Sequence, residues 1–310
     1  MTIIRGISLA TWCFLMQATA LHAQNLGHVG EGKFGVVVMA HGGPQTWNEG
    51  VSRMLQPLGK QYELEIAFGM ADAYSLQEAI SKLESRGVTD IGVVRLFISG
   101  ESWLERTGQI LGLQEGAPER PAPAPAIHGH QGEHGEHGGH AAPHTGHRME
   151  FWRVDSDARF RLSQEGLSQA PEMDAVLVER TAALSKDPQN EDVLILAHGP
   201  GDDAENERWI RYISERTKAL RESYNFNSIK VATLREDWPE KREAAQQIVR
   251  DYVAAANEAG RTALVVPYRV YGFGPYAEVL DGLDYVADET GLVPHPAVAD
   301  WIARQIRSLE

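Results

Sequence analysis

Two nearly identical phrases, each an apolar run ending in His-Gly, constrain the fold of this chain more than any other feature. The first is VVVMAHGG at residues 36–43, and the second is VLILAHGPG at residues 193–201. Short runs rich in Val and Ile are typical of strands that are buried on both faces. Glycine after the histidine permits a sharp turn and a close backbone approach to a ligand. The chain therefore carries the same strand-and-turn unit twice.

The segments after each phrase repeat in one order, which is strand, helix, strand, helix and strand. In the first half we expect strands at 35–40, 63–68 and 91–98 and helices at 47–61 and 76–86. In the second half we expect strands at 192–197, 228–234 and 262–268 and helices at 204–224 and 240–259. Strands that alternate with helices indicate parallel βαβ units. The sequence predicts an α/β protein with two similar lobes, each a parallel sheet flanked by helices.

The first half is longer than the second by roughly the length of a Pro/His-rich stretch at residues 115–148. Seven of the twelve histidines lie between His128 and His147, and almost no apolar residues accompany them. We expect a disordered loop that binds metal ions weakly through neutral imidazoles. A low-complexity linker without function is the alternative. With this insertion set aside, we predict an N-terminal lobe at 24–190 and a C-terminal lobe at 191–310.

Residues 1–23 have the pattern of a secretory signal peptide. Arg5 precedes an apolar run that is short for a membrane span, and Ala23 offers a cleavage site. An uncleaved N-terminal anchor is the alternative. We expect a periplasmic or secreted protein that is not stably inserted in a membrane after cleavage. The only cysteine, Cys13, lies in this segment, so metal ligands in the mature protein must be His, Asp or Glu.

The formal net charge of −14 argues against a nucleic acid as the partner, because phosphates repel an acidic surface. An anionic small ligand is still compatible with this charge, since a basic pocket can exist within an acidic exterior.

His41 and His198 each follow the first strand of a repeat. Ligands of parallel α/β sheets bind outside the carboxyl ends of the strands, and the helix that follows presents unpaired N–H groups there. The two histidines are therefore candidate functional residues. Shared ancestry would also duplicate a purely structural histidine, and this alternative stays open.

The chain resembles the class II chelatases, the cobaltochelatases and ferrochelatases that act on sirohydrochlorin. The resemblance rests on the AHG phrase, on AFGMADAYSLQEAISKL and GVTDIGVVRLFISGESW in the first half, and on the closing GLVPHPAVADWI. It implies two lobes facing across a cleft, and insertion of Co²⁺, Fe²⁺ or Ni²⁺ into a sirohydrochlorin-type tetrapyrrole without ATP. The divalent metal is then a substrate, and no organic cofactor is implied. His41 and His198 would be catalytic, as metal ligands or as acceptors of pyrrole protons.

The sequence departs from this family in one loop. Relatives usually carry a second histidine after the third strand, whereas FISGESWLER and YRVYGFGPYAEV contain none. Glu101 and Glu278 are the nearest replacements, and Glu101 is the better candidate. The implied metal ligands are therefore His41, His198 and Glu101, with a solvated loop carboxylate as the alternative role of Glu101.

Other residue types suit a cleft for a large, partly apolar macrocycle. The aromatic candidates, for which core packing is the alternative, are Trp103, Tyr268, Tyr271, Phe273 and Tyr276. Arg235 or Arg242 would meet a substrate carboxylate, although a charged helix start explains them as well. The acidic run at Asp202–Trp209 would place negative charge near an ion, or would complement a helix dipole.

Two other functions compete with the chelatase reaction. A non-enzymatic periplasmic protein that binds metal or tetrapyrrole fits export and the missing histidine. A hydrolase is weaker, because no Ser or Cys nucleophile lies in a G-x-S-x-G elbow.

Overall fold

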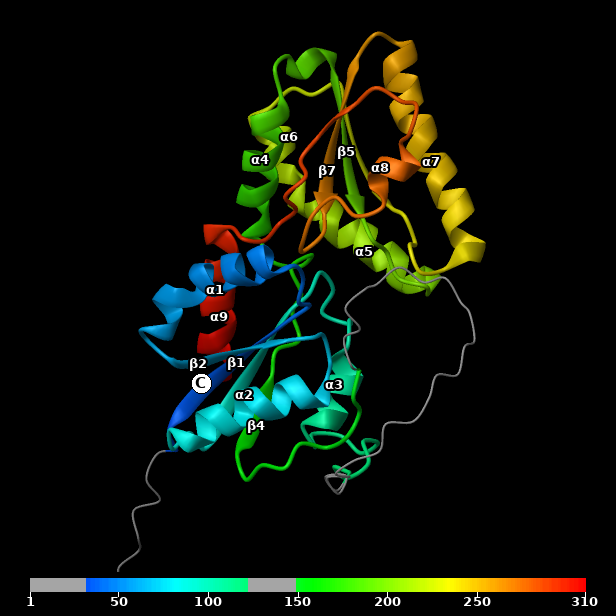
Figure 1. The fold of residues 1–310 in the computed structure, drawn as a ribbon. Coiled ribbons are helices and arrows are strands. Elements are labelled where there is room, and N and C mark those ends of the chain that lie inside the picture. Colours follow the sequence, from blue (N-terminus) through cyan, green and yellow to red (C-terminus); the bar gives the residue numbers. More distant parts are fainter. Residues whose placement is uncertain (1–31, 122–148) are drawn as a thin grey trace, which may run out of the picture. The chain divides into compact units, whose positions relative to one another are not determined.

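The computed structural model describes residues 32–121 and 149–310 of the chain, and these residues form two lobes (Figure 1). Each lobe contains a four-stranded parallel sheet, in the order β2-β1-β3-β4 in one and β6-β5-β7-β8 in the other. Helices cover the faces of both sheets, so the predicted fold class is confirmed. The predicted signal peptide and most of the His-rich stretch lie outside the described residues.

The elements of the first half follow the predicted order. They are β1 (Phe34–Ala40), α1 (Gln45–Gly59), β2 (Glu63–Phe68), α2 (Ala73–Ser85), β3 (Asp90–Leu96), α3 (Leu104–Ile110), β4 (Arg159–Leu162) and α4 (Met173–Leu184). The elements of the second half are η1 (Pro188–Asn190), β5 (Glu191–Ala197), α5 (Asp203–Arg216), α6 (Lys218–Ser223), β6 (Ser228–Thr233), α7 (Pro239–Glu258), β7 (Thr262–Tyr268), α8 (Tyr276–Val279), β8 (Val286–Ala287) and α9 (Pro296–Leu309).

Three differences from the prediction have local causes. The helix expected at 204–224 is divided into α5 and α6 at Thr217, whose hydroxyl donates to the carbonyl of Ser214 at 2.7 Å. The edge strands β4 and β8 were not predicted, because RFRL alternates charged and apolar residues over four positions and VA is two residues long. Neither is a continuous apolar run of the kind that reveals a central strand.

The backbone of the two lobes repeats at the turns that follow the strands. After β1 and β5, Gly42 and Gly199 have φ values of 80° and 78°. After β2 and β6, Met70 and Arg235 both have a φ of 58°, a conformation that is uncommon for residues other than glycine. Matching turns at matching positions agree with a duplicated α/β unit.

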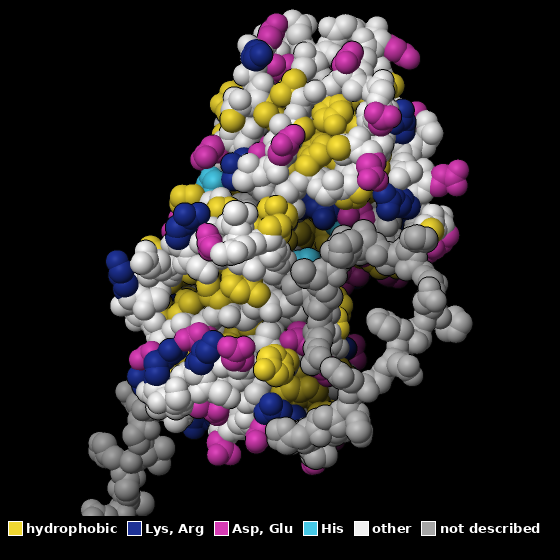
Figure 2. Space-filling model, viewed as in Figure 1, with side chains coloured by type: hydrophobic (Ala, Val, Ile, Leu, Met, Phe, Trp, Pro, Cys, Tyr) yellow, Lys and Arg dark blue, Asp and Glu magenta, His cyan; other side chains and the backbone are white. Residues whose placement is uncertain are grey.

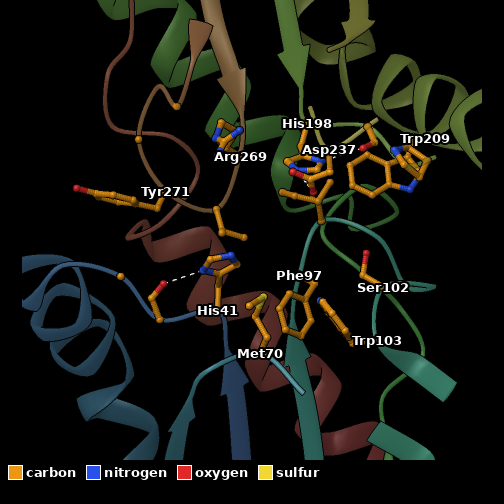
Figure 3. Close-up of a pocket in the computed structure, with 18 of the residues that line it drawn as sticks. His41, Met70, Phe97, Ser102, Trp103, His198, Trp209, Asp237, Arg269 and Tyr271 are labelled. Carbon is orange, nitrogen blue, oxygen red and sulfur yellow. Dashed lines mark hydrogen bonds and ion pairs between the residues drawn. The ribbon is translucent and has the colours of Figure 1, made fainter. Parts of the chain in front are cut away.

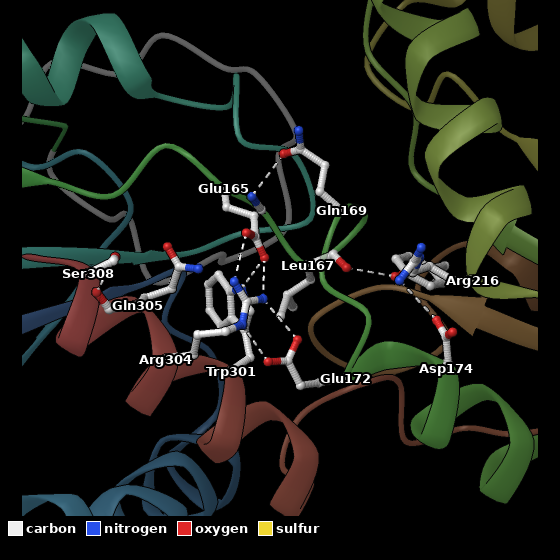
Figure 4. Close-up of polar contacts among 12 residues, drawn as sticks. Glu165, Leu167, Gln169, Glu172, Asp174, Arg216, Trp301, Arg304, Gln305 and Ser308 are labelled. Carbon is white, nitrogen blue, oxygen red and sulfur yellow. Dashed lines mark hydrogen bonds and ion pairs between the residues drawn. The ribbon is translucent and has the colours of Figure 1, made fainter.

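The helix that closes each half packs against the sheet of the other lobe. Helix α4 contacts α6 and β7 of the second lobe, whereas α9 contacts β3 and α1 of the first lobe. Trp301 of α9 is fully buried, and its Nε1 donates to Glu165 at 3.0 Å. Arg304 of the same helix bonds to both Glu165 and Glu172 (Figure 4). The two lobes therefore share one continuous apolar core.

His295 joins the two exchanged helices at their ends. Its Nδ1 accepts the N–H of Ala297 at 3.1 Å, which caps the first turn of α9. Its Nε2 lies 3.0 Å from the carboxylate of Glu179 in α4. His295, at the start of α9, thus connects the two lobes.

Replacement of Trp301 by alanine tests the importance of this exchange. We expect the free energy of unfolding to fall by about 3–5 kcal/mol, because a fully buried indole leaves a cavity. The control is Arg307→Ala, an exposed position on the same helix, where we expect a change within about 0.5 kcal/mol. Urea unfolding followed by circular dichroism measures both, and equal stability of the two variants would contradict the exchange.

Candidate functional site

The two predicted histidines point into the same cavity, one from each lobe (Figure 3). His41 lies directly after β1 and His198 directly after β5. Each ring is positioned in the same way, with Nδ1 2.7 Å from the carbonyl of Gly42 or 2.8 Å from that of Gly199. The structure therefore brings together the residues that the repeat predicted.

The cavity has a volume of about 1400 Å³ and lies between the carboxyl ends of the two sheets. Figure 2 shows a hollow between the lobes with hydrophobic side chains inside it. Glycines form part of the wall on both sides and let the backbone come close to a ligand. The lining glycines are Gly42, Gly43, Gly199, Gly201, Gly272 and Gly274. The volume of the cavity exceeds that of most small-molecule pockets.

The surroundings of the two histidines differ. The Nε2 atom of His198 lies 3.1 Å from Asp237 and 3.9 Å from Glu236, both on the loop after β6. The corresponding loop after β2 presents Met70 to the cavity beside His41 (Figure 3). A carboxylate at Nε2 orients an imidazole and stabilises its protonated form. Asp237 was not among the predicted site residues, although it lies two positions after Arg235 in the loop that follows the predicted strand at 228–234.

Glu101 lines the cavity as expected, but its carboxylate is occupied. Arg208 of α5 donates to it from Nε at 2.8 Å and from a terminal nitrogen at 2.6 Å. This pair bridges the first and second lobes, and the hydrogen bond to Glu101 raises the pKa of Arg208. Glu278 is exposed in α8 and does not line the cavity.

The loop that carries Glu101 is held by a buried arginine. Arg95 is 1% exposed and donates to the carbonyls of Gly100, Ser102 and Ser163 at 2.7–2.8 Å. Burial lowers the pKa of Arg95 to about 10. Because the guanidinium satisfies three carbonyls at once, it fixes the shape of the loop at the cavity wall.

Three of the five aromatic candidates line the cavity, namely Trp103, Tyr271 and Phe273. The prediction was wrong for Tyr268 and Tyr276, which are fully buried in the core. The hydroxyl of Tyr268 donates to the carbonyl of Leu167 at 2.9 Å, within the core that the two lobes share.

The cation at the cavity is not one of the predicted arginines. Arg235 is 8% exposed and bonds to the carbonyls of Pro200 and Gly201, so it shapes the turn after His198. Arg242 does not line the cavity, whereas Arg269 does. Arg269 directly follows a predicted strand, and that position was the signal by which it could have been found.

Glu205, in the acidic run, is half-buried and lines the cavity. It accepts a hydrogen bond from Nε1 of Trp209 at 3.0 Å. Burial raises the pKa of Glu205, and the nearby charge of Glu101 adds to this effect. Asp202 also lines the cavity, and its side chain caps α5.

Comparison with known proteins identifies the architecture. No protein-family model and no curated protein sequence matches the chain. Among solved structures, SirB from Bacillus subtilis with Fe³⁺ matches with a TM-score of 0.57 and 14% identity, covering 89% of this chain and 95% of SirB. The sirohydrochlorin chelatase SirB from Bacillus subtilis subspecies spizizenii with cobalt matches with a TM-score of 0.54 and 11% identity, with the same coverage. The fold is that of the class II chelatases.

A third structure has the same fold within a longer chain. DR2241 from Deinococcus radiodurans is a multi-domain protein with structural similarity to chelatases, and it matches with a TM-score of 0.52 and 20% identity. The match covers 90% of this chain and 56% of DR2241. At these identities the comparisons establish the chelatase fold alone.

On this chelatase fold, the side chains at the cavity do not form a closed metal cage. Within residues 32–121 and 149–310, no group of three or more His, Cys, Asp or Glu side chains is arranged to hold a metal ion. The histidines and carboxylates instead face the cavity singly or in pairs. Such a wall offers a metal ion few protein ligands.

Within the two described ranges, no helix has both the length and the hydropathy that are needed to cross a membrane.

The raised pKa of Glu205 gives a prediction on stability. In the unfolded chain this carboxyl loses its proton at a lower pH than in the folded protein, so its ionisation destabilises the fold as pH rises. We expect Glu205→Gln to become more stable relative to the unaltered protein between about pH 4 and about pH 8. Urea unfolding at both pH values measures this difference, and a gain that is equal at both would contradict the assignment.

Proposed function

We propose that this protein inserts a divalent metal ion, Co²⁺, Fe²⁺ or Ni²⁺, into a sirohydrochlorin-type tetrapyrrole without ATP. One observation carries the proposal, namely that strand-end imidazoles from both lobes face a single cavity of about 1400 Å³ on a chelatase fold. A cavity of this size suits a large planar macrocycle, and the SirB structures hold Fe³⁺ and cobalt.

The sparse set of ligands suits a metal ion that must be released. Neutral imidazole binds borderline divalent ions near neutral pH. Two imidazoles, from His41 and His198, leave most of the coordination sphere to water and to the nitrogens of the macrocycle. Glu101 becomes available as a third ligand when its pair with Arg208 opens.

Metal insertion also releases two pyrrole protons, and the site contains a base to receive them. An imidazole within reach of the N–H group accepts a proton as a general base. His198 is the candidate for this role, and the carboxylate of Asp237, 3.1 Å from its Nε2, can share the proton that the ring accepts. His41, which lines the same cavity from the other lobe, is then the candidate metal ligand.

Removal of either imidazole should abolish turnover. We expect His41→Ala and His198→Ala to lower kcat by at least about 10²-fold, because each change removes a ligand or a general base. The assay follows the absorbance of sirohydrochlorin with Co²⁺ or Fe²⁺, against a blank without protein. Glu258→Gln, an exposed change on α7, is the control. Turnover that persists in both histidine variants would refute the proposed mechanism.

A second candidate function is non-enzymatic binding of metal or tetrapyrrole in the periplasm. Its support is the His-rich stretch in the sequence. Export, which would place the protein in the periplasm or outside the cell, is part of this proposal.

The residues that follow the His-rich stretch are anchored next to the cavity wall. Arg106 donates to the carbonyls of Ala71, Met149 and Glu150, at 2.8–3.2 Å. Asp72 accepts the N–H of Glu150 at 2.8 Å. Ala71 and Asp72 belong to the turn that presents Met70 to the cavity, so this end of the stretch is joined to the site.

Metal uptake tests the role of the His-rich stretch, and turnover separates the two candidate functions. We expect a variant with the seven histidines between His128 and His147 replaced by Asn to lose most of its Ni²⁺ uptake in calorimetry, since each imidazole is a ligand. If the protein is a chelatase, this Asn variant still turns over sirohydrochlorin at saturating metal. If the protein only binds its ligands, it yields at most one equivalent of metallated product per protein. Unchanged uptake would exclude a metal-gathering role for the stretch.

A further inference from the structure

The charges that line the cavity are mainly negative. The carboxylates of Glu101, Asp202, Glu205, Asp237 and Glu289 face it, and Arg269 is the only Lys or Arg among the described lining residues. This imbalance matters for a tetrapyrrole, because such macrocycles differ chiefly in the number of carboxylates on their periphery. The charge of the lining therefore bears on how many carboxylates a bound macrocycle can carry.

The arginines near the cavity are already paired. Arg269 forms an ion pair with Glu236, and Arg208 is held in the two-bonded pair with Glu101. Each of these guanidinium charges is offset by its carboxylate partner, so an anionic group on a ligand meets a nearly neutral pair rather than a free cation.

Several of the carboxylates, in contrast, have no cationic partner. Asp202, Glu205 and Glu289 form no ion pair within the described part of the chain. Negative charges in a concave wall reinforce one another and repel anions, while they attract divalent cations. The same wall that draws a metal ion in opposes a macrocycle with many carboxylates.

We propose that the cavity selects a tetrapyrrole with few ionised carboxylates over one with many. The inference rests on the proposed function, because it specifies which macrocycle the same site accepts. Sirohydrochlorin, an octacarboxylate, is then turned over with a higher KM than a relative of the same ring size whose carboxylates are fewer or amidated. The exposed aromatic faces of Trp103 and Tyr271 supply contacts that do not depend on charge.

Metal-free porphyrins of one ring size test the selectivity without requiring catalysis. Binding of uroporphyrin, coproporphyrin and deuteroporphyrin, an octa-, a tetra- and a dicarboxylate, is measured by quenching of tryptophan fluorescence. We expect deuteroporphyrin to bind at least about tenfold more tightly than uroporphyrin at low ionic strength. Added salt should strengthen uroporphyrin binding, since it screens repulsion, and should leave deuteroporphyrin binding nearly unchanged.

A charge variant separates electrostatic selectivity from the greater hydrophobicity of deuteroporphyrin. Glu289→Gln removes one negative charge from the wall, and we expect uroporphyrin affinity to rise roughly threefold without a change for deuteroporphyrin. Glu258→Gln removes the same charge away from the cavity and should change neither affinity. If uroporphyrin binds more tightly than deuteroporphyrin, and if added salt weakens its binding, the inference is overturned and the proposed function still stands. Failure of all three porphyrins to bind would overturn the inference, whereas the proposed function is tested separately by turnover of sirohydrochlorin.

Discussion

The exchange of the two closing helices is the constraint on which the rest of the structure depends. Because α4 packs on the second sheet and α9 on the first, the chain crosses between the lobes twice. The lobes cannot separate without exposing the shared core, including the buried indole of Trp301. This linkage keeps the carboxyl ends of β1 and β5 at one cavity, so that residues 157 positions apart in the sequence, His41 and His198, act on the same contents.

The two lobes share the backbone of the site but differ in its chemistry. The turns after β2 and β6 keep the same unusual φ of 58°, yet one carries Met70 and the other Arg235. In the second lobe, that turn leads to Glu236 and Asp237 beside His198. The two equivalent imidazoles thus lie beside different side chains, with Met70 on the loop of one lobe and two carboxylates on the loop of the other.

Local sequence patterns predicted the parts of the fold that depend on local physics. The central strands and the two histidines were found, because buried runs and His-Gly turns need only a few adjacent residues. The exchange of α4 and α9 was not, because an amphipathic pattern shows that one face is buried but not against which sheet. Likewise the sequence showed Glu101 but not Arg208, and it gave no means to distinguish the buried Tyr268 from the cavity-facing Tyr271. Each of these depends on contacts between distant segments.

The scarcity of ligands at the cavity bears on the choice between catalysis and storage. An enzyme gains rate only from interactions that are stronger in the transition state than in the bound substrates. A complete cage of carboxylates and imidazoles would bind the free ion more tightly than its half-transferred form, and would slow its release. In the described part of the chain, Glu101 is instead paired with Arg208. The carboxylates of Asp202, Glu205 and Glu289 line the cavity and attract a cation through their charge. Charge that attracts an ion without coordinating it raises the local metal concentration and does not oppose transfer, as the proposed chelatase reaction requires.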